Sequence, residues 1–139
     1  MNMHTKDKGS LAEAFVIADL VQKGYKIALP IGENVPFDLI AICPDYRLVK
    51  IQIKYRKLAR NGTVSVKLAS IWKNSNVTRV VDYDLDVIDY FAVYCPEANA
   101  VAYVPSRELK RCKVFARRLE PSRNNQKSRV RVFGTYSNF

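Results

Sequence analysis

The stretch FDLIAICPDYRLVKIQIKY, residues 37–55, is typical of two short apolar strands joined by a turn. Side chains alternate between the two faces of a strand, so the length of the loop decides which of them share a face. A three-residue loop at 44–46 places Asp38 opposite Gln52, and a five-residue loop places Asp38 opposite Lys54. Either odd-length loop brings the three polar side chains onto one face, whereas an even-length loop separates them. We therefore predict a hairpin that presents a carboxylate, an amide and an ammonium group together.

The segment before this hairpin predicts one helix. Ser10 is a favourable N-cap residue, and Gly24 suits the end of a helix. Apolar residues cover most of the helix between them, which predicts that it is largely buried: Leu11, Ala14, Phe15, Ala18 and Val21 recur at helical spacing, with Val16, Ile17 and Leu20 on the other sides. A strand over 25–29 and a loop over 30–36 then lead into the hairpin.

The segment after the hairpin predicts further strands. Asn61-Gly62 lies between two alternating runs and is a strong hairpin signal. This turn would pair residues 48–55 with the next strand, and would create a polar, basic face from Gln52, Lys54, Arg56, Ser65 and Lys67. Residues 71–87 look irregular or partly helical. Residues 89–105 predict a hairpin that turns at 96–99, and residues 106–109 predict a short helix.

Charge and composition limit the classes of function. The 139 residues include 23 Lys and Arg against 13 Asp and Glu, which gives a net charge of +10 and predicts a polyanionic partner, most commonly nucleic acid. The length predicts one domain over 1–139, ending in a basic segment over 107–139. The single histidine, His4, argues against histidine-dependent catalysis.

The same composition predicts a cytoplasmic protein that does not enter a membrane. The three cysteines form no CxxC pair and suit free thiols in a reducing compartment. No apolar stretch approaches the roughly 18 residues of a transmembrane helix, and the polar first residues do not resemble a signal peptide.

The polar face of the first hairpin suits phosphodiester hydrolysis. That reaction needs an activated water and stabilised phosphoryl oxygens, which magnesium ions held by carboxylates can provide. Asp38 offers a hard oxygen ligand, the backbone carbonyl of Ile53 a further candidate ligand, and Gln52 a neutral amide. Lys54 can orient or deprotonate water, or offset phosphate charge. Glu13 is the candidate second carboxylate, because a carboxylate in an apolar helix needs a partner or a metal.

These residues resemble those of the PD-(D/E)xK nucleases, whose core pattern is E…D…(D/E)xK on a helix and a hairpin. Glu13 matches the helix acid, Asp38 in VPFDLIAI the first hairpin acid, and Lys54 in VKIQIKY the lysine, while Gln52 stands at the second acid position. The later run FAVYCPEANAVAYVP is similar to the closing hairpin of a branch that includes the cyanobacterial group I intron homing endonuclease, which shares the Q-x-K departure.

The resemblance implies an α/β fold with a restriction-endonuclease-like core, in which a mixed central β-sheet is flanked by helices. It also implies dependence on Mg²⁺, with Mn²⁺ as a substitute, and cleavage of double-stranded DNA by a homodimer or homotetramer. By this resemblance Glu13, Asp38, Gln52 and Lys54 form the catalytic site, with metal bound by Glu13, Asp38 and the Ile53 carbonyl. The glutamine leaves the number of bound metal ions open.

Structural interpretations of the same residues also stay open. Ser10 and Glu13 fit the S-x-x-E capping box, in which the glutamate only caps its own helix. Asp38 fits a turn residue that follows a loop. Gln52 and Lys54 fit the solvated face of an antiparallel strand.

The choice between related functions stays open in the same way. The alternatives to a homing endonuclease are a Holliday junction resolvase, a restriction-type nuclease and a DNA-binding module that keeps the fold without hydrolysis. In each case basic side chains would contact DNA phosphates, which position the duplex without reading its sequence. The candidates for these contacts are Arg56, Lys57, Lys67, Arg107, Lys110 and Arg111. Whether Tyr83, Tyr90 or Trp72 packs in a core or an interface is not decided by the sequence.

Overall fold

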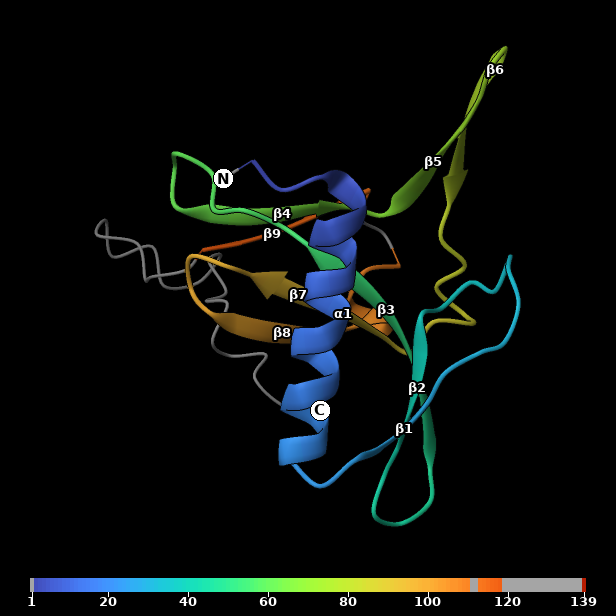
Figure 1. The fold of residues 1–139 in the computed structure, drawn as a ribbon, viewed down its shortest axis with the longest axis vertical. Helices are drawn as coiled ribbons and strands as arrows, with labels where there is room; N and C mark the ends of the chain where they lie inside the picture. The colour runs from blue at the N-terminus through green and yellow to red at the C-terminus, as the bar shows by residue number, and fades with distance from the viewer. Residues whose placement is uncertain (1, 111–112, 119–138) are drawn as a thin grey trace.

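A computed structural model of the chain describes residues 2–110, 113–118 and 139 (Figure 1). In chain order its elements are α1 (Thr5–Gln22), β1 (Lys26–Ala28), β2 (Leu39–Ile42), β3 (Leu48–Tyr55), β4 (Thr63–Lys67), β5 (Ala69–Asn74), β6 (Val77–Asp82), β7 (Tyr90–Cys95), β8 (Ala100–Pro105), the 3₁₀ turn η1 (Ser106–Glu108) and β9 (Val114–Arg118).

Five strands form the central sheet, in the order β1-β2-β3-β7-β8. Strands β3 and β7 pair in parallel, and the other neighbouring strands pair antiparallel. The predicted mixed sheet is therefore confirmed. Its parallel pair lies at the middle of the sheet, where β7 is apolar on both faces because both are covered.

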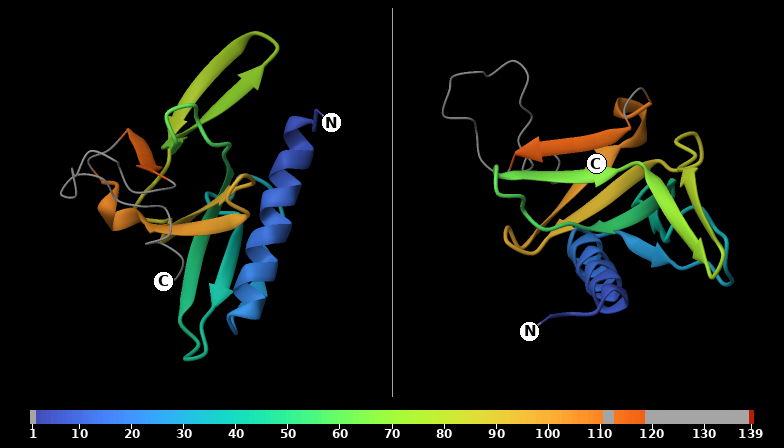
Figure 2. Two further views of the ribbon diagram at one scale, coloured as in Figure 1. Left: turned by 90° about the vertical axis from the view of Figure 1, so that its left-hand side faces the viewer. Right: turned by 90° about the horizontal axis from the view of Figure 1, so that it is seen from above.

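The two faces of this sheet are covered differently. Helix α1 packs on one face, and the antiparallel pair β4–β9 lies over the other (Figure 2). The core under α1 contains Val16, Leu20, Leu39, Ile51, Ile53 and Tyr103, and the core under β4–β9 contains Val64, Val66, Phe91, Val93, Val104 and Phe115. In the described part of the chain, the second face is thus covered mainly by strands rather than by a helix.

The β2–β3 hairpin has the register of the three-residue loop. Ile40 pairs with Lys50 and Ile42 with Leu48, and the backbone N–H of Cys43 donates to the Arg47 carbonyl at 2.8 Å. The loop is residues 44–46, and its last residue, Tyr46, has φ +65°, as a type I turn followed by a left-handed residue requires. The alternating apolar residues of β3 then face α1.

The predicted pairing across Asn61-Gly62 is wrong, although the turn itself is present. Gly62 has φ +77° and its N–H donates to the Ala59 carbonyl at 2.9 Å. Strand β4 nevertheless pairs with β9, because the edge of β3 on that side is occupied by β7. Arg56 and Lys67 are therefore not opposite each other, and the expected basic face on one sheet does not form.

Residues 71–87 also differ from the prediction. Most of them belong to the hairpin β5–β6, which projects from the rest of the molecule in Figure 1. The hairpin over 89–105 is confirmed, with Cys95 paired to Ala100 across the turn at 96–99. The predicted short helix is the 3₁₀ turn η1.

Helix α1 begins earlier than predicted. Its N-cap residue is His4, so Ser10 lies inside the helix and donates from its hydroxyl to the Lys6 carbonyl at 3.1 Å. The predicted end is confirmed, with Gly24 at φ +93°. The buried stripe is Ala12, Val16 and Leu20, whereas Ala14, Phe15, Ala18 and Val21 are exposed, so the helix covers the sheet with one narrow side. No described helix is long and apolar enough to cross a membrane.

Candidate active site

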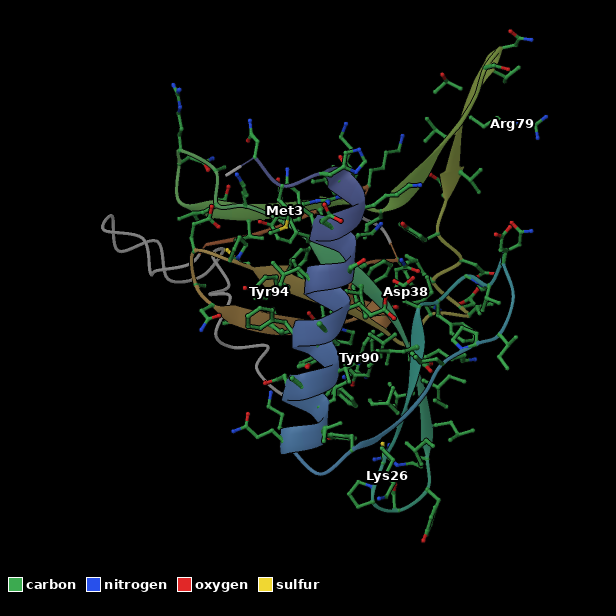
Figure 3. All side chains as sticks on the ribbon, in the orientation of Figure 1. Met3, Lys26, Asp38, Arg79, Tyr90 and Tyr94 are labelled. Carbon is green, nitrogen blue, oxygen red and sulfur yellow. The ribbon has the colours of Figure 1, made fainter. Side chains whose placement is uncertain are left out.

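The candidate site forms where β3 continues beyond the end of β2. Strand β2 pairs only with residues 48–51 of β3, and Asp38 directly precedes β2. The backbone N–H of Asp38 donates to the Ile51 carbonyl at 2.9 Å, which places its side chain beside the unpaired edge of β3. Figure 3 shows Asp38 beside α1, at the opposite end of the hairpin from Lys26.

The Asp38 carboxylate is fixed by two donors from β3. Its Oδ2 accepts from the Gln52 Nε2 at 2.8 Å and from the Ile53 backbone N–H at 2.7 Å. Within the described residues, no donor reaches Oδ1. A turn residue would bond its own loop, so these cross-strand bonds favour an oriented carboxylate over the turn interpretation.

Burial raises the pKa of Asp38, and the Ile53 N–H and the nearby Lys54 charge only partly oppose this shift. Two hydrogen-bond donors and one nearby positive charge thus do not offset the cost of burying this carboxylate. A cation bound at Oδ1 would supply that stabilisation. The site is therefore better suited to a bound cation than to an isolated carboxylate.

Glu13 approaches the same place from α1. It is half-buried and lines a cavity of about 200 Å³ together with Gly9, Ala12, Asp38, Gln52, Ile53 and Tyr55. The capping-box interpretation is wrong, because α1 begins at Thr5 and Ser10 caps nothing. Glu13 and Asp38, 25 positions apart in the sequence, are thus brought to one cavity at the open edge of the sheet.

The oxygen ligands that this cavity offers fit a metal ion that keeps several waters. Its acidic side chains are Glu13 and Asp38, and no group of three His, Cys, Asp or Glu side chains is found among the described residues. Ile53 directs its N–H to Asp38, and in a strand the carbonyl of a residue points to the same side as its N–H. Two carboxylates and one carbonyl leave coordination positions for several waters, which suits Mg²⁺ because that ion releases its waters reluctantly.

Lys54 lies on β3 between Ile53 and Tyr55, which line the cavity, and its own side chain is half-buried outside that lining. Its Nζ donates to the hydroxyl of Tyr83 and lies 4.5 Å from the centroid of that ring. Burial lowers the pKa of Lys54 to about 8, with a smaller contribution from the positive charge of Arg56, while Asp38 acts in the opposite direction. A solvated lysine on the wet face of a strand would not show this shift, so that interpretation is not favoured.

Tyr83 is the neighbour that sequence reasoning did not assign to the site. It lies directly after β6, 29 residues from Lys54, and no motif spacing connects the two. Burial raises the pKa of its hydroxyl, and the Asp38 charge adds to the shift. Only the path of the chain after the β5–β6 hairpin brings Tyr83 to Lys54.

The predicted DNA-binding residues are distributed over several places. Arg56 donates to the Tyr55 carbonyl at 2.8 Å at the end of β3, and Lys57 is exposed next to it. Lys67 is exposed on β4. Arg107 and Lys110 are exposed near η1, where Lys110 pairs with Asp86 at 2.8 Å. Arg111 and most of the basic segment over 107–139 lie outside the described residues.

Comparisons with known proteins identify the family and the fold of the chain. A family model described as PD-(D/E)XK endonuclease matches residues 3–139. The structure of the bacterial homing endonuclease I-Ssp6803I is similar with a TM-score of 0.75 and 18% identity, over 96% of this chain and 88% of that chain. Hjc, a Holliday junction resolvase from Archaeoglobus fulgidus, is similar with a TM-score of 0.50 and 19% identity, over 80% of this chain and 84% of that chain.

No curated protein matches the sequence. The two structural similarities, at these identities, show the fold alone, which is the restriction-endonuclease-like fold that the sequence predicts. The family model covers nearly the whole chain, including each predicted residue of the site. The chain therefore belongs to the PD-(D/E)XK endonuclease family, whose members hydrolyse phosphodiester bonds.

Proposed function

We propose that this chain is a magnesium-dependent endonuclease that cuts double-stranded DNA at the cavity between α1 and β3. The observation that carries the proposal is the Asp38 carboxylate, which two β3 donors hold by one oxygen in a cavity shared with Glu13. This arrangement leaves Oδ1 without a donor among the described residues, and so available to a metal.

The residues of the cavity fit the metal and have distinct parts in the reaction. Glu13, Asp38 and the Ile53 carbonyl would hold Mg²⁺, and Mn²⁺ could replace it because it takes the same oxygen ligands. When bound, the metal would supply Lewis-acid stabilisation of the phosphoryl oxygens and a more acidic water. Gln52 orients Asp38 through its amide nitrogen instead of adding a third carboxylate.

Lys54 would act on the attacking water or on the phosphate. With a pKa of about 8, its ammonium form predominates at pH 7 and can offset phosphate charge. At pH 8 a large neutral fraction exists, which can accept a proton from water. The hydrogen bond to Tyr83 and the half-burial of the side chain hold the amine in place in both protonation states.

The proposed substrate is duplex DNA, cut by a symmetric homodimer or homotetramer as a homing endonuclease would cut it. The net charge of +10 supports a polyanionic substrate. One centre of this kind cuts one strand, so two related centres are the simplest route to a double-strand break. The fold shared with a bacterial homing endonuclease over most of both chains supports this assignment, and the similarity to a junction resolvase makes a four-way junction the second substrate to test.

Plasmid nicking with and without Mg²⁺ tests the proposal. Asp38→Asn keeps the shape of the side chain and should lower the cleavage rate by roughly three orders of magnitude or more. Asp45→Asn is the matched control, because Asp45 is an exposed loop residue of the same hairpin whose contact with Arg47 is an exposed ion pair. It should cleave at the wild-type rate.

Thermal unfolding separates a catalyst from a DNA-binding module. Mg²⁺ should raise the melting temperature of the wild type and of Asp45→Asn, but not that of Asp38→Asn, because only binding to the folded state stabilises it. A wild type that neither nicks DNA nor responds to Mg²⁺ would exclude the nuclease and leave the binding module.

A further inference from the structure

Tyr83 presents a fixed acceptor to the lysine of the site. The Lys54 Nζ donates to the Tyr83 hydroxyl and lies 4.5 Å from the centroid of its ring. A lysine side chain has four flexible carbon–carbon bonds, so its place on β3 alone does not determine where the amine lies. A contact from outside β3 is therefore needed to hold the amine at one position.

Tyr83 itself is well anchored. Its backbone N–H donates to the Leu68 carbonyl at 3.2 Å, and its ring packs edge-on against Phe91 with centroids 5.5 Å apart. Phe91 is 1% exposed and belongs to the core under β4–β9. The tyrosine thus connects the core under β4–β9 to Lys54.

The chemistry of a phenol suits this position better than that of a carboxylate. A hydroxyl accepts a hydrogen bond from the ammonium without bringing a full negative charge, whereas Asp or Glu here would neutralise Lys54 and repel a DNA phosphate. The other charged groups near Lys54 are Asp38, which directly precedes β2, and Arg56, which directly follows β3. Neither of them has a hydrogen bond to the amine within the described residues.

We propose that Tyr83 is a positioning residue of this endonuclease, which holds the Lys54 amine near the Asp38 carboxylate through its hydroxyl. The inference rests on the proposed function, since it assigns Lys54 a part in DNA cleavage. It adds to the family motif a residue that comes from the end of the β5–β6 hairpin, on the far side of the sheet from α1.

Cleavage kinetics test the positioning role. Tyr83→Phe keeps the ring and its contact with Phe91 but removes the acceptor. It should lower kcat about tenfold, the typical effect of one hydrogen bond to a charged group, while KM for DNA stays within about twofold. Tyr83→Leu, which also removes the ring, should lower kcat further. Tyr46→Phe removes a hydroxyl from a side chain that is 84% exposed and should leave kcat unchanged.

A double-mutant cycle tests the contact without using cleavage. Tyr83→Phe should lower the denaturant midpoint of unfolding in the wild-type background, because it leaves a half-buried ammonium without its acceptor. In a Lys54→Met background the same change should have little effect, because no ammonium remains. Equal destabilisation in both backgrounds would overturn the inference.

The outcomes separate this inference from the proposed function. A wild type that cuts DNA while Tyr83→Phe retains the same kcat overturns the positioning role alone. A wild type that does not cut DNA overturns the proposed function and the inference with it.

Discussion

At the scale of residues, the site combines a carboxylate and an amine whose charged forms are both disfavoured by burial. Burial raises the pKa of Asp38 and lowers the pKa of Lys54 to about 8. Each group would be better stabilised with a ligand: Asp38 with a cation, and Lys54 with a phosphate. Under the proposed function, metal and DNA would supply these opposite charges, and ionisable groups with shifted pKa values are common at functional sites.

The lowered pKa of Lys54 predicts how stability depends on pH. The pKa is about 8 in the folded protein and about 10.4 in an unfolded chain, so between these values the unfolded state binds more protons. The charged lysine thus destabilises the folded protein below pH 8, and this cost disappears as the pH rises toward 10.4. The unfolding free energy of the wild type should rise relative to that of Lys54→Met between pH 8 and pH 10.

Urea unfolding at pH 7, 8, 9 and 10 measures this difference. Lys26→Met is the control, because Lys26 is exposed and lies at the other end of the β2–β3 hairpin (Figure 3). A constant difference between wild type and Lys54→Met over this range would contradict the lowered pKa.

At the scale of elements, the part played by Glu13 depends on where α1 begins. A helix that began at Ser10 would place Glu13 in its first turn, where a glutamate bonds the exposed N–H groups. The helix instead begins at Thr5, so Glu13 lies in its third turn with no free backbone N–H group nearby. The carboxylate is then available to the cavity that it shares with Asp38.

Ser10→Ala tests this boundary. The Ser10 hydroxyl bonds the carbonyl four residues earlier, and Ala is the better helix former, so unfolding free energy should change by less than about 0.5 kcal/mol. Loss of a true N-cap would cost about 1 kcal/mol. Chemical denaturation measures the change, and a loss of that larger size would place the helix start at Ser10.

At the scale of the whole molecule, the basic residues determine how DNA could approach the cavity. Lys57 is exposed just beyond β3, at the end of the strand that carries Gln52, Ile53 and Lys54. Lys26 is exposed on β1, at the opposite end of the hairpin. If DNA lies over the cavity, Lys57 contacts phosphate and Lys26 does not.

The salt dependence of DNA binding tests this orientation. Lys57→Ala should reduce the slope of log K against log [salt] by about one, because one phosphate contact and its counterion release are lost. Lys26→Ala removes the same charge and should leave the slope unchanged. Fluorescence anisotropy with catalytically inactive Asp38→Asn protein gives both slopes, and equal reductions would mean that charge alone, and not position, attracts the DNA.

The sequence by itself determined the features that depend on short distances along the chain. A three-residue loop between alternating strands set the register that joins Asp38 to Gln52, and four residues at 96–99 set the β7–β8 hairpin. The registers of these two hairpins depend only on nearby residues, because loop length and side-chain alternation decide the register of a hairpin. The same local reasoning predicted that Asp38, Gln52 and Lys54 share one face, whereas Glu13 was predicted from its place in an apolar helix and from the family resemblance.

Only the tertiary structure decided which strands pair when they are far apart in the sequence. The Asn61-Gly62 turn is real, but β7 occupies the edge of β3 in parallel and leaves β4 to pair with β9, 47 residues or more away. Parallel pairing needs a long crossover, and its partner is selected by the core that forms on both faces rather than by any local signal. The contact of Tyr83 with Lys54 follows from that same crossover, which is why no motif in the sequence could reveal it.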